Sequence, residues 1–383
     1  MYDTIIVGGG IAGLYCAMNI KNHLLLECND YLGGRIFTHK EPKYESGAGR
    51  YNENHILLVN IINKFKLTPI QLSNDQLYIE DSKYRPHIEK YFHKKMKKVL
   101  KNGSFDESFY QHCLHYYSKD EVDELRYIFG YTSEFLEMNA KDAIRMFKKK
   151  VGNYYIVKEG MSELVRRMSL HVNYKMKHCV TSVRENNGTF EVDGYACKKI
   201  IFAIPPDNIK QIAFLKSVHP LLKSLQTNCL LRIYAIYPNK WFAGLPNLTT
   251  NSFIRHIIPI DAEAGLVMIS YVEGRDTDVY LNSKGGLYKN VQSKIQTELK
   301  HMFPDKEIIE PTYFQPHVWK IGDHAWKPGY DSDKIAKELL NPMPNIYLCG
   351  EAFSHNQSWI EGALENATEV LDILEQGHNE HNT

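Results

Sequence analysis

A glycine-rich turn near the N-terminus constrains the fold of this chain more than any other feature. Residues 2–7 (YDTIIV) have the apolar, β-branched pattern of a short buried strand, and residues 11–20 have helical spacing. Gly8, Gly10 and Gly13 form a GxGxxG motif at the junction, and residues 23–27 (HLLLE) predict a second strand. The pattern is that of a βαβ unit of about thirty residues.

The residue types in this unit are those that bind a dinucleotide. Gly8 permits the tight turn, Gly10 lets the backbone approach a pyrophosphate, and Gly13 lets helix and strand pack closely. The helix N-terminus near Ala12 offers free N–H groups to phosphates. Glu27, about twenty residues beyond the first glycine, can accept hydrogen bonds from ribose hydroxyls and disfavours a 2′-phosphate, and hence NADP.

Two further motifs favour FAD over NAD. Gly34 and Arg35 follow the acidic strand and supply a close backbone approach and a guanidinium suited to a phosphate or a flavin edge. Near the other end, Gly350-Glu351 follows an apolar strand predicted at 345–350, and Trp359 precedes a helix predicted at 360–376. A helix N-terminus aimed at the flavin would stabilise negative charge on the reduced ring.

Together these motifs resemble the flavin-containing amine oxidase family, which includes monoamine, polyamine and L-amino-acid oxidases. The residues that carry the resemblance are Gly8–Gly13, Glu27, Gly33-Gly34-Arg35, Gly350-Glu351 and Glu361-Gly362-Ala363, with looser matches at Gly160-Met161, Leu164 and 203–206. The resemblance implies a mixed α/β (α+β) fold, in which a Rossmann-like two-dinucleotide-binding domain for FAD is interleaved with a substrate domain. We expect the FAD domain at 1–75, 152–210 and 311–383, and the substrate domain at 76–151 and 211–310.

The resemblance also implies an activity. A hydride equivalent passes from the C–N bond of an amine or amino acid to flavin N5, oxygen reoxidises the flavin to give hydrogen peroxide, and the imine hydrolyses. No cysteine lies in 319–330, where monoamine oxidases attach the flavin, so non-covalent FAD is expected. Val180 matches a backbone contact to adenine. The candidate cofactor-binding residues are Gly8, Gly10, Ala12, Gly13, Glu27, Gly34, Arg35, Gly47, Ala48, Gly49, Arg50, Val180, Gly350, Glu351, Trp359, Ile360 and Ala363.

Arg50 is the first candidate on the substrate side. It ends the segment 45–50 (ESGAGR), whose glycines let the backbone pass close to the flavin. In L-amino-acid oxidases a similar element places an arginine against the substrate carboxylate, and a bidentate pair of that kind would select amino acids over simple amines. The alternative is an arginine that braces the loop or a flavin phosphate.

Arg232 and Trp359 are the candidate catalytic residues. With a one-residue gap, Arg232 takes the place of a family lysine that holds a water near flavin N5. An arginine cannot lose its proton, so only a fixed positive charge remains available; the alternative is a solvent-facing strand residue. Trp359 matches an aromatic wall facing the flavin and Tyr330 the opposite wall. Trp319 and Trp326 flank the same segment, and core packing is the alternative for all four rings.

Composition limits the partners and the compartment. Lys plus Arg (46) nearly equals Asp plus Glu (45), which favours neither nucleic acid nor membrane. A basic stretch at 83–101 reads as a solvated helix face or as a docking surface for an anionic partner. Seven scattered cysteines without a CxxC pair suggest neither a metal site nor a disulfide framework, so we expect reduced thiols. With no signal peptide and no apolar run of about 18 residues, a cytoplasmic location is expected.

Two other functions fit the same nucleotide site. One is a flavin-dependent desaturase or isomerase of a non-amine substrate, although the polar middle of the chain lacks the greasy channel such enzymes need. The other is a flavin-binding scaffold without catalysis, which the Arg232 substitution keeps open.

Overall fold

The computed structural model describes residues 1–150 and 152–380, and these form two compact units. Unit 1 contains 1–72, 150–226 and the stretch from Tyr330 onwards, and unit 2 contains 73–149 and 227–329. The expected domain bounds differ from these units at four places: 73–75 and 311–329 lie in unit 2, and Lys150 and 211–226 lie in unit 1. Residue 151, where we placed a domain boundary, lies outside the described residues.

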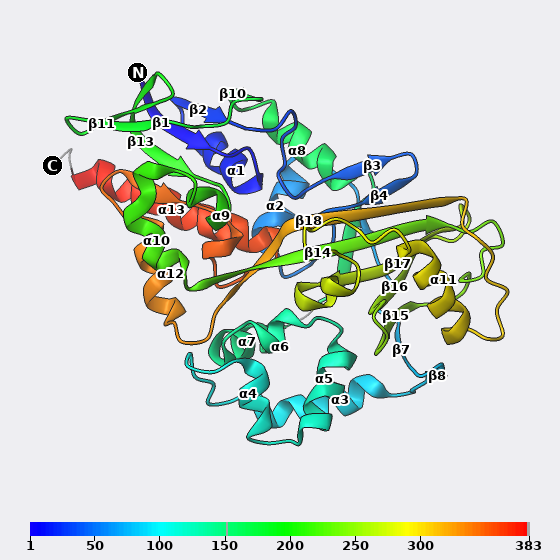
Figure 1. Ribbon diagram of the computed structural model, residues 1–383. Coiled ribbons are helices and arrows are strands. Elements are labelled where there is room, and N and C mark those ends of the chain that lie inside the picture. The colour runs from blue at the N-terminus through cyan, green and yellow to red at the C-terminus, as the bar shows by residue number, and fades with distance from the viewer. Residues whose placement is uncertain (151, 381–383) are drawn as a thin grey trace. The chain divides into compact units, whose positions relative to one another are not determined.

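A mainly parallel sheet forms the centre of unit 1. Strand β1 (Tyr2–Val7) lies between β2 (His23–Leu26) and β13 (Tyr195–Phe202), and all three are parallel. Val7 is in register with both Leu26 and Phe202, so the carboxyl ends of the three strands lie next to one another, just before Gly8. Figure 1 shows the three strands in this sheet. The predicted βαβ unit is therefore confirmed. The other strands of this sheet are β10 (Tyr174–Lys175), β11 (Val183–Asn186), β12 (Thr189–Val192) and β19 (Ile346–Leu348).

Helices pack on this sheet through apolar residues at helical spacing. α1 (Ile11–Asn19) and α13 (Ile360–Glu380) share one buried cluster with the sheet. Beyond the fully buried first turn of α13, the cluster residues Leu364, Ala367, Val370 and Leu374 are three or four residues apart, which places them on one face of the helix. The remaining elements of unit 1 are α2 (Ile56–Lys64), α8 (Met161–Ser169), α9 (Pro206–Ile209), η1 (Ala213–Val218), α10 (His219–Leu222), α12 (Ser332–Leu340), η3 (Glu351–Phe353), β3 (Thr38–Lys40), β4 (Lys43–Glu45), β5 (Tyr51–Asn52), β6 (Pro69–Gln71) and β9 (Tyr154–Val157).

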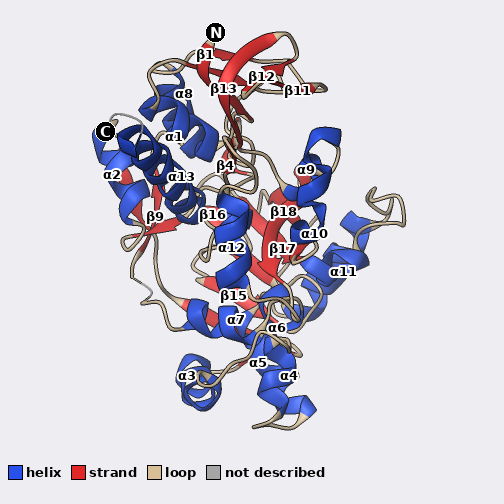
Figure 2. Ribbon diagram, turned by 90° about the vertical axis from the view of Figure 1, so that its left-hand side faces the viewer, coloured by secondary structure: helices blue, strands red, loops and turns tan. Residues whose placement is uncertain are grey.

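Unit 2 combines a second sheet with a group of helices (Figure 2). The strand order is β18-β14-β17-β16-β15-β7-β8, and α11 (Val291–Met302) shares the buried cluster of this sheet. A separate aromatic-rich cluster joins the helices between 88 and 147. The strands are β7 (Gln76–Glu80), β8 (Lys83–Tyr84), β14 (Leu225–Ile236), β15 (Asn247–Thr250), β16 (His256–Asp261), β17 (Leu266–Glu273) and β18 (Tyr313–Trp326); the helices are α3 (Ile88–Val99), α4 (Phe109–Leu114), α5 (Lys119–Phe129), α6 (Ser133–Leu136), α7 (Ala140–Phe147) and η2 (Gly274–Val279).

The basic stretch is partly neutralised within unit 2. Arg85 pairs with Glu124 on α5 at 2.7 Å, and Lys95 pairs with Glu121 at 2.5 Å. Lys95 also lies 4.5 Å from the centre of the Tyr117 ring. Neighbouring carboxylates and an aromatic ring thus hold some of these cations, whereas Lys90, Lys94 and Lys97 are exposed on α3.

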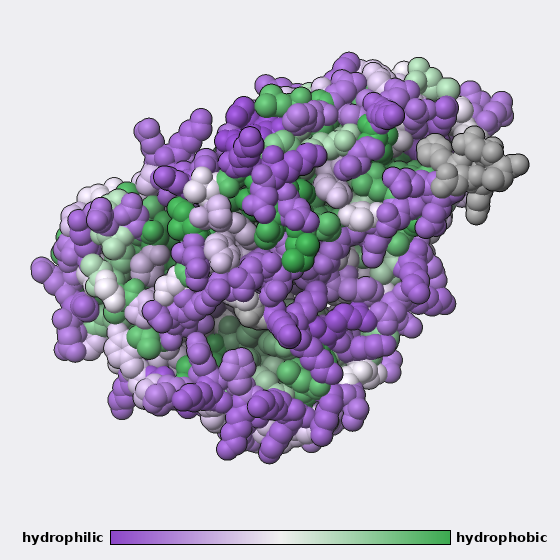
Figure 3. All heavy atoms as spheres, turned by 180° about the vertical axis from the view of Figure 1, so that it is seen from behind, coloured by the Kyte–Doolittle hydropathy of each residue, from purple (hydrophilic) through white to green (hydrophobic). Residues whose placement is uncertain are grey.

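Polar side chains cover most of the face drawn in Figure 3, and hydrophobic atoms form smaller patches between them. This distribution follows from the buried clusters, which collect the large apolar side chains of each unit. Across residues 1–150 and 152–380, every helix is too short or too polar to cross a bilayer.

Candidate active site

Glycine is required at the three motif positions on two different grounds, close packing and open space. A Cβ on Gly8 would lie 2.4 Å from the Ala203 carbonyl oxygen, and one on Gly13 would lie 2.0 Å from the Gly8 oxygen. Both positions therefore serve close packing. A Cβ on Gly10 would meet no heavy atom within 4 Å, and no side chain caps α1 there. The open space at an uncapped helix N-terminus fits a pyrophosphate group.

The second glycine segment lies beside the first and leads to the C-terminal motif. Gly33 donates its N–H to the Gly9 oxygen at 2.8 Å, and a Cβ on Gly34 would lie 3.4 Å from the Gly10 Cα. Arg35 Nη1 then contacts Glu351 Oε1 at 2.5 Å, and the Glu351 side chain is buried. The ion pair joins the motifs from the two ends of the chain in one unit. Arg35 therefore has a carboxylate partner within the protein, in addition to any contact that it makes with a cofactor.

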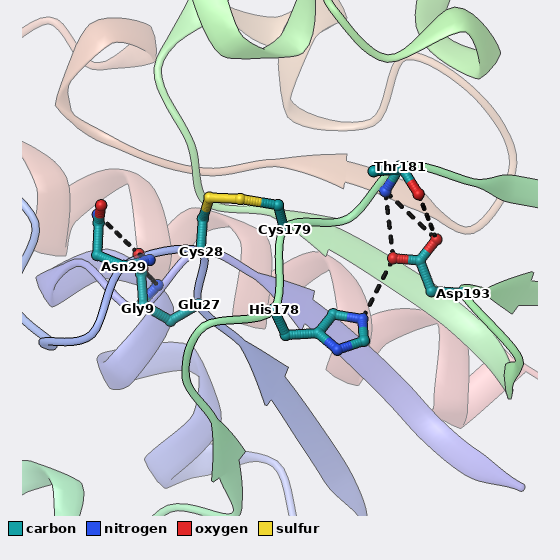
Figure 4. The surroundings of a disulfide bond; sticks show 8 residues. All are labelled: Gly9, Glu27, Cys28, Asn29, His178, Cys179, Thr181 and Asp193. Atoms are coloured by element: carbon teal, nitrogen blue, oxygen red, sulfur yellow. Dashed lines mark hydrogen bonds and ion pairs between the residues drawn. A yellow bond between two sulfur atoms is a disulfide. The ribbon is translucent and has the colours of Figure 1, made fainter.

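Glu27 is buried and already oriented at the end of β2. Its Oε2 accepts the Gly9 N–H at 2.6 Å, and its Oε1 accepts the Asn29 N–H at 2.7 Å and the Asn29 Nδ2 at 2.9 Å (Figure 4). Backbone donors hold the carboxylate at the turn formed by Gly9. A carboxylate held at the glycine turn is suited to accept ribose hydroxyls.

Our expectation of reduced thiols is wrong for one pair of cysteines. Cys28 and Cys179 form a disulfide whose Cα atoms are 4.1 Å apart, at a sequence separation of 151 residues. The positions of the two cysteines in the sequence do not reveal that they are close in space, because this proximity depends on β10 lying beside β2. The cysteine argument for a reducing compartment therefore no longer holds. The five other cysteines are free thiols.

The glycines at 47 and 49 pack against the chain itself. A Cβ on Gly47 would lie 2.0 Å from the Arg35 oxygen, and one on Gly49 would lie 2.2 Å from Glu45 Cγ. Ala48 donates its N–H to the same Arg35 oxygen at 2.9 Å. The segment is thus fixed on the strand-to-loop stretch that carries Arg35, and it delivers Arg50 to a defined position.

Arg50 belongs to an aromatic cluster at the start of α13. Its guanidinium carbon lies 4.8 Å from the centre of the Tyr154 ring and 6.0 Å from that of Trp359. The two rings are nearly parallel, at 16° with centres 6.2 Å apart. His55 meets Trp359 edge-on at 4.8 Å, and its Nε2 lies 3.1 Å from Asn52 Nδ2. Three distant stretches, around residues 50, 154 and 359, thus form one arginine–aromatic cluster in unit 1.

The other predicted aromatic wall is not in this cluster. Among the described residues, Tyr330 has no ring contact with Trp359, although both belong to unit 1. Tyr154, which the sequence did not single out, takes the parallel position. Trp319 and Trp326 belong to unit 2, where Trp326 is 1 % exposed and its carbonyl oxygen accepts the Asn139 N–H at 2.8 Å. This burial favours a packing role for Trp326.

Glu361 supports the cluster from the first turn of α13. Its two carboxylate oxygens accept the N–H groups of Leu57 at 2.8 Å and Leu58 at 2.9 Å, at the start of α2. The His55 side chain does not cap α2, so Glu361 supplies the missing acceptor for the first N–H groups of this helix. The two bonds span 304 and 303 residues of sequence. The carboxylate is 3 % exposed and joins α2 to α13.

Replacing Glu361 with alanine should therefore lower the free energy of unfolding by about 2 kcal/mol, since two buried helix N–H groups lose their acceptor. Urea denaturation followed by circular dichroism measures this. Glu375→Ala changes an exposed carboxylate on the same helix and should shift stability by less than about 0.5 kcal/mol. Equal losses in the two variants would contradict the capping role.

Arg232 lies on β14 of unit 2 among tyrosines. It is opposite Tyr271 on β17, and its guanidinium carbon is 4.5 Å from the centre of that ring. Burial by itself lowers the pKa of Arg232, but the neighbouring Tyr271 and Tyr234 hydroxyls raise it above its ordinary value. Arg232 is partly buried as a residue, and its Nε atom is buried. The cation is permanent, as the residue type requires.

A buried group of carboxylates is a second feature of unit 2 that the sequence did not reveal. Glu273 Oε1 accepts the N–H groups of Thr132 at 2.6 Å and Ser133 at 2.8 Å, whereas within the described chain its Oε2 and the Oε2 of Glu134 are buried without a hydrogen-bond partner. Burial and the nearby charge of Asp323 raise the pKa of Glu134 to about 8. Burial and the charges of Glu134 and Asp323 raise the pKa of Glu273 as well.

The raised pKa values predict that stability falls as pH rises. The folded state keeps protons that the unfolded chain releases above a pH of about 4.5, so stability is full below that pH and is lost toward about pH 8. Glu134→Gln imitates the protonated form and should be more stable than the wild type at pH 8 by about 1–3 kcal/mol, with no gain at pH 4. Thermal denaturation across this pH range measures the difference, and Glu263→Gln, at an exposed position, is the control. If Glu134→Gln and Glu263→Gln both showed the pH dependence of the wild type, the burial argument would be contradicted.

The chain matches known families over most of its length. The family described as flavin containing amine oxidoreductase matches residues 69–370, and the NAD(P)-binding Rossmann-like domain matches residues 6–56. Amine oxidase [flavin-containing] A from Equus caballus is 20% identical over an alignment 467 positions long, which covers 98% of this chain and 86% of the relative. FAD-dependent oxidoreductase dbaF from Emericella nidulans is 38% identical over 63 residues, 14% of each chain.

Solved structures share the fold. A triple mutant of putrescine oxidase, redesigned in cofactor binding, superposes with a TM-score of 0.80 at 15% identity, covering 98% of this chain and 99% of that one. Wild-type putrescine oxidase bound to putrescine gives a TM-score of 0.79 at the same identity and coverage. The mixed α/β fold with a Rossmann-like domain is thereby confirmed. FAD is the cofactor that these relatives indicate, and the glycine turn has the space to hold its pyrophosphate. The chain belongs to the family of flavin-containing amine oxidoreductases.

Proposed function

We propose that the protein oxidises the C–N bond of an amine or amino acid, with oxygen as the electron acceptor and hydrogen peroxide as a product. FAD, when bound, supplies the hydride-accepting chemistry. The observation that carries the proposal is the arginine–aromatic cluster of Arg50, Tyr154 and Trp359, which lies in the same unit as the glycine turn. Family membership supports it, since the family oxidises amines.

Within the cluster, charge argues for a substrate that carries a carboxylate. The faces of Tyr154 and Trp359 can orient an amine, but the guanidinium of Arg50 already lies over the Tyr154 ring. A second cation beside it would be repelled, whereas a carboxylate would be attracted and held by two parallel hydrogen bonds. An amino acid satisfies both demands, with its amine toward the rings and its carboxylate toward Arg50.

The likeness to putrescine oxidase supports the other possibility, a diamine without a carboxylate. In either case we propose Trp359 as a positioning wall for the reacting amine and Arg232 as a fixed positive charge that stabilises negative charge developing during the reaction. The assignments to the cofactor are those of the glycine turn, Glu27, the Gly34-Arg35 and Gly350-Glu351 pairs, and the start of α13.

The test is an anaerobic screen of the purified protein with bound FAD. A panel pairs each amino acid with the amine formed by its decarboxylation, and the loss of oxidised-flavin absorbance is followed before air is admitted and peroxide is measured. Reduction by an amine or amino acid followed by peroxide release supports the proposal. Reduction without peroxide rejects oxygen as acceptor. If only a non-amine substrate reduces the flavin, the protein is a desaturase or isomerase. If no donor reduces the flavin, the protein is a flavin-binding scaffold.

A further inference from the structure

We propose that the Cys28–Cys179 disulfide is a redox-modification site that controls how tightly the chain holds FAD, with dithiol reductants as its reaction partners. This rests on the proposed assignment of Glu27 and Val180 to the adenosine end of the cofactor. Cys28 directly follows Glu27, and Cys179 directly precedes Val180. The bond therefore joins the two stretches that would hold the ribose and the adenine.

The two stretches are also joined by backbone hydrogen bonds around the disulfide. His178 donates its N–H to the Glu27 oxygen at 2.8 Å, and Lys177 donates its N–H to the Asn29 oxygen at 2.9 Å. These bonds flank Cys28 on both sides and continue the pairing of β10 with β2. They set the alignment of the two stretches, and the disulfide adds a covalent limit on their separation.

The far side of the second stretch has an anchor of its own. Asp193 accepts the N–H of Ser182 at 2.7 Å. It also accepts hydrogen bonds from the Thr181 N–H at 3.1 Å and from the ring Nε2 of His178 at 3.2 Å (Figure 4). Residues 178–182 are thus held between Asp193 on one side and Cys28 on the other. Cleavage of the disulfide leaves the Asp193 anchor and the two backbone hydrogen bonds in place but removes the covalent limit beside Val180. We expect the separation of the ribose and adenine contacts to vary more widely in the dithiol form.

The disulfide is accessible to a reductant. Cys28 and Cys179 are both exposed, whereas Cys16, Cys113, Cys197 and Cys349 are buried. A thiolate of the reductant attacks one exposed sulfur and forms a mixed disulfide, which the second thiol of the reductant resolves. The S–S bond of the protein gains two electrons and two protons and becomes two thiols, and the reductant leaves as a disulfide. Exposed disulfides are the ones that undergo this exchange in regulatory proteins.

Coupling of this kind acts in both directions. If the disulfide form binds FAD more tightly than the dithiol form, bound FAD makes the disulfide harder to reduce by the same factor. A coupling of about tenfold in FAD affinity corresponds to about 30 mV in the potential of the cysteine pair. The two effects are measured on different groups, so each checks the other.

The experiment titrates apoprotein with FAD before and after treatment with dithiothreitol, and follows the change in flavin fluorescence. Reduction should raise the dissociation constant by about tenfold, and reoxidation should restore it. The C28S/C179S variant should show the weaker affinity in both conditions. C229S removes a half-buried thiol of unit 2 and should respond to the reductant as the wild type does.

Mass spectrometry after alkylation reports whether the bond was cleaved in each sample. An unchanged FAD affinity in protein whose Cys28 and Cys179 are both alkylated would overturn the proposal, as would alkylation of both residues before any reductant is added. Failure to bind FAD in either redox state would overturn the nucleotide assignment together with it. FAD affinity that responds to reductant in a protein without amine oxidation would leave this inference standing and reject only the proposed activity.

Discussion

Replacing Gly10 with valine should abolish FAD retention while the protein stays folded. A Cβ at this position meets no protein atom within 4 Å and the backbone φ of Gly10 is −68°, so the chain itself can accommodate the side chain. The same open space is where a pyrophosphate would approach the start of α1, and a valine would fill it. FAD affinity should fall by at least about 100-fold, equivalent to about 3 kcal/mol.

The measurement is the flavin absorbance that remains after gel filtration, together with the thermal denaturation curve of the apoprotein. Gly10→Ala is the graded control and should lose less affinity than the valine variant. Gly13→Ala is the contrasting case, because its Cβ would lie 2.0 Å from the Gly8 oxygen and should destabilise the fold itself. A folded Gly10→Val protein with a full complement of FAD would refute the placement of the pyrophosphate.

Replacing Arg50 with alanine should raise the Michaelis constant for an amino acid by about 30- to 100-fold, since a charge-assisted pair of about 2–3 kcal/mol is lost. The Michaelis constant for the decarboxylated amine should stay the same or fall, because the cation that repels its ammonium is gone. The FAD content of the variant should match that of the wild type. Steady-state kinetics with each pair of substrates measures the difference.

Arg50→Lys is the matched control. It keeps the charge but cannot form the bidentate pair or stack flat on Tyr154, so it should recover only part of the loss. Equal effects of Arg50→Ala on the amino acid and on its amine would show that Arg50 braces the cluster and does not bind a carboxylate. Loss of FAD from the variant would assign the guanidinium to the cofactor.

The nucleotide half of the fold could be predicted because its signals are local. The steric demand at Gly13 acts against the Gly8 oxygen five residues earlier, and the apolar residues of β1 and β2 are consecutive. The helices at 11–19 and 56–64 likewise follow from spacing within one element. The secondary structure of these segments can be predicted from patterns that lie within about thirty consecutive residues.

Contacts between distant stretches could not be predicted in the same way. Tyr154 joins Arg50 and Trp359 only because β9 pairs with β5, and the disulfide depends on β10 lying beside β2. The long strand at 313–326 and the short one at 76–80 were missed, because proline, histidine and lysine break the alternation of the first and polar residues flank the second. The raised pKa of Glu134 arises from burial that no local pattern encodes.

The sheet of unit 1 has a consequence for biosynthesis. β13 lies between β1, at residues 2–7, and β19, at residues 346–348, and the Arg35–Glu351 ion pair spans 316 residues. A nascent chain that has not yet emerged from the ribosome beyond Glu351 therefore lacks both that strand and the helix that follows it. We therefore expect cofactor uptake to wait until α13 has also left the ribosome, and chains stalled before this point should be colourless.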